Sequence, residues 1–313
     1  MYKNFIIELA KVIRAAVKPN LKNINAGNIA NIAATGDLTF KIDQIAEDKV
    51  ESYLQNIPLK VAYYTEDRGL VGEKSSDFIL IIDPIDGSRS AMCNFESCVV
   101  SIAMAKNKVN PTIGDVIYAC IYEIKNDTYF WAERNRGIEI VSNNKKIKLR
   151  RRSNSSLQYL RWSVELMGRP TNIIFRFLGE LANLSSVYGG IFVFNSACYS
   201  ITRLLTGQLD AYIDLGIRIV EEFPNMMTKS FKIAGAGKLR GLYPHDLAAA
   251  VLLCEEAGCP ITTAFGENMN DLALLDYSET NLSSCIATNN KITHQAILNH
   301  IESKLRKFRK DET

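Results

Sequence analysis

The segment LIIDPIDGS, residues 80–88, ends a run of apolar, strand-forming residues with two acids three positions apart. Asp83 and Asp86 repel and desolvate each other in such a place unless a cation or hydrogen-bond donors compensate them. Magnesium takes hard oxygen ligands, and two ions about 3.5 to 4 Å apart need a carboxylate that bridges them. Asp83, Asp86 and the Ile85 carbonyl therefore suit a two-metal site. The alternative is a strand followed by a tight turn, because Pro-x-Asp-Gly is favourable turn chemistry.

Gly87 and Ser88 follow the two aspartates directly. Glycine permits close approach of the backbone to a ligand, and the N–H groups of Gly87 and Ser88 can point at an anion. A phosphate group is the natural partner of two cations and exposed amides. The segment as a whole therefore favours phosphate chemistry.

Two further acids occupy comparable positions. Glu66 closes the short strand-like run YYTE, for which a solvated strand end is the alternative. Asp246 precedes the Ala-rich run LAAAVLLCEEA, which predicts a helix that Gly258 ends. A plain N-cap aspartate explains Asp246, but a helix N-terminus also suits a carboxylate that shares a metal beside a bound phosphate.

Composition excludes several classes of protein. The 313 residues are 47% hydrophobic and 23% charged, which is typical of globular proteins. The formal net charge of +3 is too small to indicate a nucleic-acid binder on its own. The three histidines cannot form a zinc site of the His-Glu-x-x-His kind, so oxygen ligands must hold any metal. Seven scattered cysteines indicate reduced thiols, and no apolar run could span a bilayer, so we expect a cytoplasmic protein without a membrane partner.

The elements that must position these acids follow from periodicity. Apolar spacing predicts helices over residues 2–17 and 42–54, and apolar runs predict strands that end at Glu66 and Asp83. Alternating residues after Asp86 predict antiparallel strands and hairpins, whereas the segments after residue 156 alternate between strand-like and helix-like patterns. We therefore expect two domains: an N-terminal α+β domain, residues 1–152, with Asp43, Glu66, Asp83 and Asp86, and a C-terminal α/β domain, residues 153–313, with Asp214 and Asp246.

Residues 217–243 fit neither the helix pattern nor the strand pattern. They allow three interpretations: a lid, a dimer contact or a surface excursion. The basic run KKIKLRRR, residues 145–152, predicts a solvated hairpin edge, with contact to nucleic acid or an acidic partner as the alternative.

The segments YYTED, LIIDPIDGS and PHDLAAA, in this order, resemble the inositol monophosphatase family. That family carries Glu-Glu or Glu-Asp, then Asp-Pro-x-Asp-Gly-Thr/Ser, then x-Asp-x-Ala-Ala/Gly. The segments ATGDLTFKIDQIAEDKVESYL and FNSACYSITRLLTGQLDAYIDLG are also similar to family segments, and the resemblance is closest to archaeal-type members. It covers about residues 30–300 and implies an α/β (α+β) layered sandwich of two mixed sheets with helices.

The resemblance also implies a phosphoric monoester hydrolase that uses two or three Mg²⁺ ions. The ions would be held by side chains and one carbonyl at positions matching the family motifs: Glu66, Asp83, Ile85, Asp86 and Asp246. Asp83 would bridge two ions, and Asp67 or Glu66 would hold a looser third. The catalytic residues would be Asp43 and Ser88, which orient and deprotonate the attacking water, together with Glu66.

Substrate contacts are implied in the same way. Gly87 and Ser88 would hold the phosphate, and Ser196, Ala197 and Asp214 match positions that contact polyol hydroxyls. Archaeal-type members often carry an Arg-x-x-Gly-Ser stretch, and here Phe192 replaces the arginine. A second substrate phosphate would then need a substitute, for which the candidates are Arg161, Arg169 and Arg176.

The expected reaction is therefore hydrolysis of inositol monophosphate or a related sugar or polyol phosphate, with fructose 1,6-bisphosphate as a further substrate. One alternative is a phosphatase of adenosine 3′,5′-bisphosphate. Another is a non-catalytic regulatory homologue that binds nucleic acid or an acidic partner. The resemblance also implies a homodimer, with a small phosphate ester rather than nucleic acid as the ligand.

Overall fold

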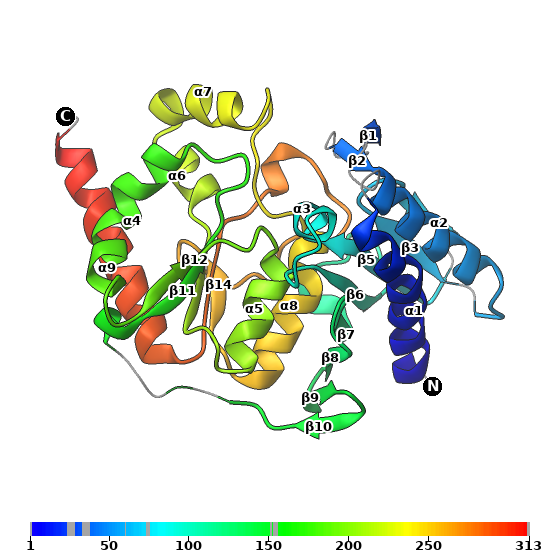
Figure 1. Cartoon of the computed structure of the whole chain (residues 1–313). Helices are drawn as coiled ribbons and strands as arrows, with labels where there is room; N and C mark the ends of the chain where they lie inside the picture. The colour runs from blue at the N-terminus through cyan, green and yellow to red at the C-terminus, as the bar shows by residue number, and fades with distance from the viewer. Residues whose placement is uncertain are drawn as a thin grey trace.

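The computed structural model describes residues 2–23, 29–32, 38–59, 61–72, 76–150, 152 and 156–311. Two mixed sheets run through the molecule, with helices between them and on both outer sides (Figure 1). This is the layered sandwich that the sequence predicts. Within the described residues, no helix has the length and apolar character needed to cross a membrane.

The larger sheet has eight strands in the order β10-β9-β8-β7-β6-β5-β3-β4. Only β3 and β5 pair in parallel, and the other neighbours are antiparallel. The strands are β3 (Ala62–Thr65), β4 (Gly69–Val71), β5 (Phe78–Asp86), β6 (Val99–Lys106), β7 (Val116–Glu123), β8 (Thr128–Glu133), β9 (Gly137–Ser142) and β10 (Lys145–Ile147). The strands and hairpins expected before residue 150 are thus confirmed.

The smaller sheet has five strands in the order β12-β11-β13-β15-β14. Its β11 pairs in parallel with β12 and β13, whereas β15 is antiparallel to β13 and β14. The strands are β11 (Arg161–Val164), β12 (Gly190–Phe192), β13 (Ala211–Ile213), β14 (Ile261–Thr263) and β15 (Cys285–Thr288). A separate antiparallel pair joins β1 (Ile29–Ile32) to β2 (Leu38–Phe40).

The helices connect and cover the sheets. The α-helices are α1 (Tyr2–Val17), α2 (Lys41–Gln55), α3 (Ser88–Met92), α4 (Thr171–Ser185), α5 (Ala197–Leu205), α6 (Gly216–Glu222), α7 (Pro224–Ala234), α8 (Pro244–Ala257) and α9 (Lys291–Asp311). Short 3₁₀ turns are η1 (Lys18–Lys22), η2 (Ile113–Asp115), η3 (Leu157–Tyr159) and η4 (Glu279–Asn281). The two predicted N-terminal helices correspond to α1 and α2, and Gly258 ends α8 in a left-handed conformation as expected.

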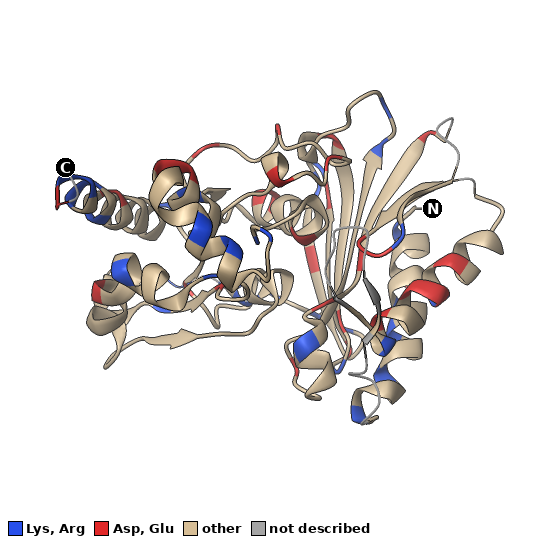
Figure 2. Ribbon diagram, turned by 90° about the horizontal axis from the view of Figure 1, so that it is seen from above, with Lys and Arg blue, Asp and Glu red and all other residues tan. Residues whose placement is uncertain are grey.

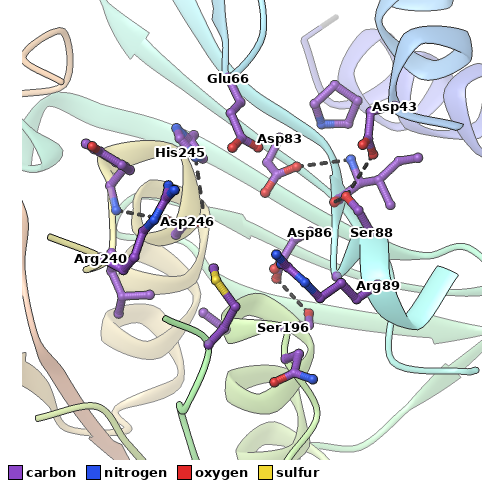
Figure 3. Close-up of a pocket in the computed structure, with 18 of the residues that line it drawn as sticks. Asp43, Glu66, Asp83, Asp86, Ser88, Arg89, Ser196, Arg240, His245 and Asp246 are labelled. Atoms are coloured by element: carbon purple, nitrogen blue, oxygen red, sulfur yellow. Dashed lines mark hydrogen bonds and ion pairs between the residues drawn. The ribbon is translucent and has the colours of Figure 1, made fainter. Parts of the chain in front are cut away.

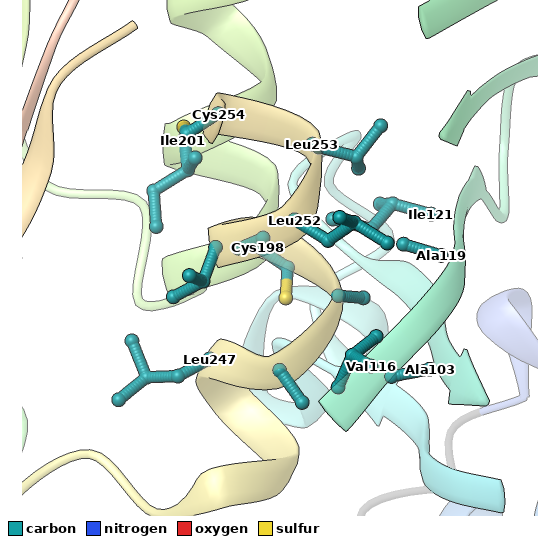
Figure 4. Packing of buried hydrophobic residues seen from close by; sticks show 14 of the residues in the cluster. Ala103, Val116, Ala119, Ile121, Cys198, Ile201, Leu247, Leu252, Leu253 and Cys254 are labelled. Carbon is teal, nitrogen blue, oxygen red and sulfur yellow. The ribbon is translucent and has the colours of Figure 1, made fainter. Parts of the chain in front are cut away.

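Residues 78–82 of β5 are all apolar because helices cover both faces of the larger sheet. Successive side chains of a strand point to opposite faces. Leu80 and Ile82 share a core with α1 and α2, whereas Ile79 and Ile81 share one with α5 and α8. Figure 4 shows this second core, in which α8 packs against β6 and β7. Burial on both faces explains the uninterrupted run FILII, and it fixes the end of β5 close to the start of α8.

Residues 217–243 form α6, α7 and the segment that leads to α8. Ile219, Phe223 and Phe231 are buried and pack into the core of the smaller sheet with α4 and α9. The interpretation of this stretch as a surface excursion is therefore wrong. The buried residues of this stretch belong to two short helices, α6 and α7, which are separated by a break at Phe223. Because of this break, the stretch shows no continuous helical periodicity in the sequence.

The expected domain boundary at residues 152–153 falls between β10 and β11, where the larger sheet ends and the smaller one begins. Helices α5 and α8 belong to the C-terminal half, but they cover one face of the larger sheet. The two halves therefore share a core, and their division into separate domains stays a prediction.

Candidate active site

A pocket opens where β5 ends and α8 begins (Figure 3). Its lining holds eight acids: Asp43, Glu47, Glu66, Asp67, Asp83, Asp86, Glu165 and Asp246. We call the four of them that carry the predicted metal-binding side chains, Glu66, Asp83, Asp86 and Asp246, the carboxylate cluster. Every predicted metal ligand, including Ile85, and every predicted catalytic residue lies in this lining.

Asp83 and Asp86 are held at the end of β5 on either side of a register shift in its pairing with β6. The Ile85 N–H donates to Asp83 Oδ1 at 3.0 Å. Asp86 Oδ2 accepts from the Ser196 hydroxyl at 2.7 Å and from the Cys198 N–H at 2.6 Å. The second oxygen of each aspartate accepts no hydrogen bond from the described part of the chain, so it is available to a ligand.

Asp246 is the third residue of α8 and shows the same division of roles. Its Oδ2 accepts from the N–H of Tyr243 at 2.8 Å, a contact that caps the helix. Its Oδ1 is free of hydrogen bonds within the described residues. Glu66 directly follows β3, and neither of its oxygens accepts a hydrogen bond from those residues. Each member of the carboxylate cluster therefore keeps at least one oxygen for another partner.

The free atoms fall into two groups that share Asp83. Asp83, Asp86 and Asp246 offer oxygens that all lie within 4.8 Å of one another, and Glu66, Asp83 and a ring nitrogen of His245 do the same. Two overlapping groups of three are the arrangement that the predicted bridging role of Asp83 requires. The first group matches the predicted ligands of one ion, and the second contains two of the predicted ligands of the other.

Burial and mutual repulsion control the charge of the carboxylate cluster. Burial, followed by repulsion from Asp246, raises the pKa of Asp86 to about 7. Burial raises the pKa of Asp246 to about 7 and those of Glu66 and Asp83 well above their usual values. Arg89, Arg169 and Arg240 also line the pocket, but among the described residues none of them forms an ion pair with a carboxylate of the cluster. A bound metal ion would supply the paired positive charge that the cluster lacks.

Asp43 lies one turn into α2 and faces Ser88 at the start of α3. The Ser88 hydroxyl donates to Asp43 Oδ1 at 2.7 Å, and the N–H of Phe40 donates to Oδ2 at 2.9 Å. Burial raises the pKa of Asp43 to about 6. Because both oxygens are engaged, Asp43 is better placed to take a proton through Ser88 than to bind a metal.

Gly87 connects the aspartates to α3 in a conformation that other residues rarely adopt. Its φ is +95°, and a Cβ atom there would collide with the carbonyl oxygen of Ser97. Glycine is therefore required for the chain to turn from β5 into α3 with Ser88 facing Asp43.

The family model of the inositol monophosphatases matches residues 2–306. The chain belongs to the inositol monophosphatase family. It is 24% identical to the fructose-1,6-bisphosphatase/inositol-1-monophosphatase of Methanothermobacter thermautotrophicus, over 96% of each chain. It is 22% identical to the fructose-1,6-bisphosphatase of Pyrococcus furiosus, over 96% of this chain and 98% of that one.

The fold of this inositol monophosphatase family member is also that of solved relatives. An IMPase from Thermotoga maritima superposes with a TM-score of 0.69 at 18% identity, and the match covers 98% of both chains. The predicted family and fold class are confirmed. The protein is therefore a phosphatase of the inositol monophosphatase and fructose-1,6-bisphosphatase type.

The residues predicted to contact substrate are only partly brought together in this family member. Gly87, Ser88, Ser196 and Ala197 line the pocket, but Asp214 does not. Asp214 lies behind the lining, where its Oδ1 accepts from Arg169 Nε at 3.1 Å and its Oδ2 from Arg169 Nη2 at 2.5 Å. This geometry does not support a direct contact between Asp214 and substrate hydroxyls.

Of the three arginines considered as substitutes at a second phosphate site, only Arg169 reaches the pocket. Arg161 and Arg176 do not line it. Two arginines that the sequence did not single out, Arg89 and Arg240, complete the basic part of the lining.

The sequence also did not identify four other residues of the pocket: Glu47, Glu165, His245 and Arg240. Glu47 follows Asp43 by one helical turn, and Glu165 directly follows β11, so a search for acids on the Asp43 face and at strand ends could have found both. Burial raises the pKa of each to about 7. His245 precedes Asp246 in the PHD motif, and burial lowers its pKa to about 3. Arg240 lies in the stretch 217–243, where no sequence signal identified a pocket residue.

Proposed function

We propose that this chain hydrolyses phosphate monoesters of inositol or a related sugar or polyol, and that it does so with two or three Mg²⁺ ions. The observation that carries the proposal is the pair of overlapping ligand groups that share Asp83. Free carboxylate oxygens at the end of a buried strand fit a hard divalent cation, and no carboxylate of the cluster is paired with a lysine or arginine of the described residues. The family relationship supports the same chemistry.

The proposed roles of the side chains follow from their contacts. Asp83, Asp86 and Asp246 hold one ion, and Glu66, Asp83 and the Ile85 carbonyl hold the other. Bound Mg²⁺ would supply acidity to the attacking water and neutralise charge that grows on the leaving oxygen.

Ser88 and Asp43 form the proposed proton relay. The Ser88 hydroxyl orients the water, and its short hydrogen bond to Asp43 Oδ1 carries the proton to that carboxylate. A pKa of about 6 lets Asp43 accept a proton near neutral pH. The amides of Gly87 and Ser88 hold the phosphate, and Ser196 fixes the orientation of Asp86.

Two arginines of the lining, Arg89 and Arg240, favour a substrate with a second anionic group. Arg169, by contrast, is already paired with both oxygens of Asp214. Arginine recognises phosphate with a planar fork of donors. Fructose 1,6-bisphosphate therefore belongs among the proposed substrates, although the family arginine near Phe192 is absent.

We also propose a homodimer. Exposed apolar residues gather around β12, which is an edge strand of the smaller sheet: Tyr159, Val187, Tyr188, Phe192 and Val193. An uncovered apolar patch at a sheet edge suits contact with a second copy. Light scattering after gel filtration measures the mass in solution, and a monomer at all concentrations would contradict this part of the proposal.

The test of activity is phosphate release from inositol 1-phosphate, fructose 1,6-bisphosphate and adenosine 3′,5′-bisphosphate, each with Mg²⁺ and with chelator. We expect Mg²⁺-dependent release from at least one of the first two. Preference for the adenosine compound would replace the proposed substrate class. No release from any of them, with the protein folded, would favour the regulatory alternative.

A further inference from the structure

His245 is the second residue of α8, directly before Asp246, and only 3% of its surface is exposed. Its ring packs beside two tyrosines that also contact each other: the ring centres of Tyr243 and Tyr277 are both 5.7 Å from it, at interplanar angles of 22° and 11°, and they are 5.8 Å from one another. The ring is therefore packed against both tyrosines. One of its nitrogens lies close to Glu66 and Asp83 of the carboxylate cluster, as Figure 3 shows.

Neither nitrogen of this buried ring has a hydrogen-bond partner among the described residues. Nδ1 is buried and unpaired, and Nε2 approaches Asp246 Oδ1 only to 3.8 Å, which is too long for a hydrogen bond. By contrast, the buried His294 has Thr262 Oγ1 at 3.0 Å and Thr288 Oγ1 at 3.2 Å. A buried polar group without a partner is costly, so the unpaired ring of His245 points to a ligand.

The geometry identifies the class of that ligand. One ring nitrogen of His245 and one oxygen each from Glu66 and Asp83 all lie within 4.8 Å of one another, close enough to surround one cation. Mg²⁺ prefers an all-oxygen shell, whereas imidazole nitrogen is a good ligand for Zn²⁺, Fe²⁺ and Ni²⁺, and Mn²⁺ binds it alongside carboxylates. The histidine therefore changes which ion this position favours.

We propose that His245 supplies a nitrogen ligand to the ion held by Glu66 and Asp83, and that this position selects a divalent transition metal over Mg²⁺. The proposal rests on the proposed metal-dependent function, because both need the carboxylate cluster to bind cations. It replaces the expectation from the sequence that only oxygen ligands hold the metal. The position formed by Asp83, Asp86 and Asp246 keeps its all-oxygen ligands.

The test uses Mn²⁺ as the probe, with the whole protein. Pulsed electron paramagnetic resonance of the Mn²⁺-loaded protein should show coupling to ¹⁴N, and His245→Phe, which keeps a ring beside the two tyrosines, should remove it. Titration calorimetry should show Mn²⁺ binding weakened about tenfold or more in His245→Phe. Binding of Mg²⁺ should change less than about threefold, because Mg²⁺ gains little from a nitrogen ligand.

The controls separate failure of this inference from failure of the metal-dependent function. If wild-type protein binds neither Mn²⁺ nor Mg²⁺, the proposed function and this inference both fail. If wild type binds Mn²⁺ without ¹⁴N coupling, or if the coupling persists in His245→Phe, only the nitrogen ligand is wrong. His294→Phe is the matched change of a remote buried histidine and should keep the coupling. If circular dichroism shows that His245→Phe is unfolded, His245→Gln, which offers an oxygen instead, gives the same test.

Discussion

The carboxylate cluster and the buried Arg169–Asp214 pair lie beside one pocket, but only the pair carries its own counter-charge. Within the cluster, Asp83 and Asp86 are buried, and Glu66 and Asp246 are half-buried. Arg169 contacts both oxygens of Asp214, and its remaining Nη1 donates to the Met167 carbonyl at 2.6 Å. In the cluster, Asp83, Asp86 and Asp246 each have one oxygen tied by N–H or O–H donors and one left open. The negative charge of Asp214 is therefore balanced within the protein, whereas the negative charges of the cluster are not.

This difference distinguishes a carboxylate with a structural role from carboxylates with a role in binding or catalysis. A buried carboxylate whose charge is matched within the protein mainly fixes neighbouring side chains, and here Asp214 holds Arg169 at the edge of the pocket. A set of carboxylates held in place by hydrogen bonds but left without a paired cation destabilises the protein until a ligand binds. Raised pKa values in such a set mark a candidate functional site. The comparison can be tested by breaking each region separately.

The largest effect is expected from Asp83→Asn. Because Asp83 belongs to both ligand groups, loss of its charge should weaken both ions and lower kcat/KM by about a thousandfold, equivalent to about 4 kcal/mol. Steady-state phosphate release on the best substrate of the panel measures this change. A variant that keeps more than about a tenth of the activity would show that Asp83 does not bridge two ions.

Two controls show that such a loss is chemical. Asp276→Asn makes the same acid-to-amide change at an acid outside the pocket lining and should leave kcat/KM within about twofold. Asp83→Asn should also raise the melting temperature of the metal-free protein, because it removes repulsion within the cluster. A lower melting temperature would instead indicate that the variant has lost structure.

The next largest effect is expected from Arg169→Met in the internally matched region. Removal of the arginine leaves Asp214 buried without a counter-charge, which should lower the free energy of unfolding by about 3–5 kcal/mol. Urea denaturation measures the change. Arg306→Met, at an arginine that is 70% exposed and paired with Glu302, is the matched control and should cost less than about 1 kcal/mol. Equal losses in the two variants would mean that burial of the Arg169–Asp214 pair does not increase its contribution to the free energy of unfolding.

A smaller effect is expected from pH in the metal-free protein. Asp86 and Asp246 have pKa values of about 7 when folded and lower ones when unfolded, so the folded state binds more protons and stability falls as pH rises through 7. Burial lowers the pKa values of His245 and His294, which has the opposite effect, but only below their unfolded value of 6.5. Between about pH 6.5 and 8 we expect a loss of about 1 kcal/mol or more.

Thermal unfolding with chelator at these two pH values measures this loss. Asp246→Asn should reduce the pH dependence, since it removes one of the titrating groups. Mg²⁺ should restore stability at pH 8, because it binds the deprotonated cluster. A metal-free protein that is more stable at pH 8 than at pH 6.5 would contradict the raised pKa values of the cluster.

The sequence predicted the cluster better than it predicted the matched pair, for a physical reason. Asp83, Asp86 and Asp246 follow local rules, since acids at the end of an apolar strand or the start of a helix need a partner. The Arg169–Asp214 contact joins residues 45 positions apart, and nothing in either local sequence shows that they meet. Asp214 was therefore taken for a substrate contact.

The same limit explains the other misses. The strands of the larger sheet and helices α1 and α2 were predicted from periodicity, which is a local property, and the fold class was predicted from the family resemblance. The burial of Phe223 and Phe231 depends on the distant helices α4 and α9, and the place of Arg240 in the pocket depends on the path of the chain after α7. The unpaired state of His245 is visible only once its neighbours in space are known.

The smallest effect is expected from the basic run at residues 145–152, which contains no residue of the carboxylate cluster or of the Arg169–Asp214 pair. Lys145 and Lys148 are exposed on or beside β10, an edge strand, where lysine discourages pairing with other chains. Arg152 pairs with the buried Asp210 at 2.8 Å and is structural, and Arg151 lies outside the described residues. Charges of both signs are interspersed in the two halves of the molecule, rather than gathered on a basic face (Figure 2).

The double change Lys145→Ser and Lys148→Ser should therefore leave kcat/KM within about twofold, and Arg151→Ala should do the same. Fluorescence anisotropy measures binding of a labelled RNA at physiological salt, and we expect the wild type and the double variant to give the same result. Two solvated lysines on an edge strand would displace few counterions from RNA, so they contribute little to its binding. If the double change abolished tight RNA binding and left phosphatase activity intact, the basic run would be a second functional surface. The comparison between the carboxylate cluster and the Arg169–Asp214 pair would then describe only the catalytic part of the protein.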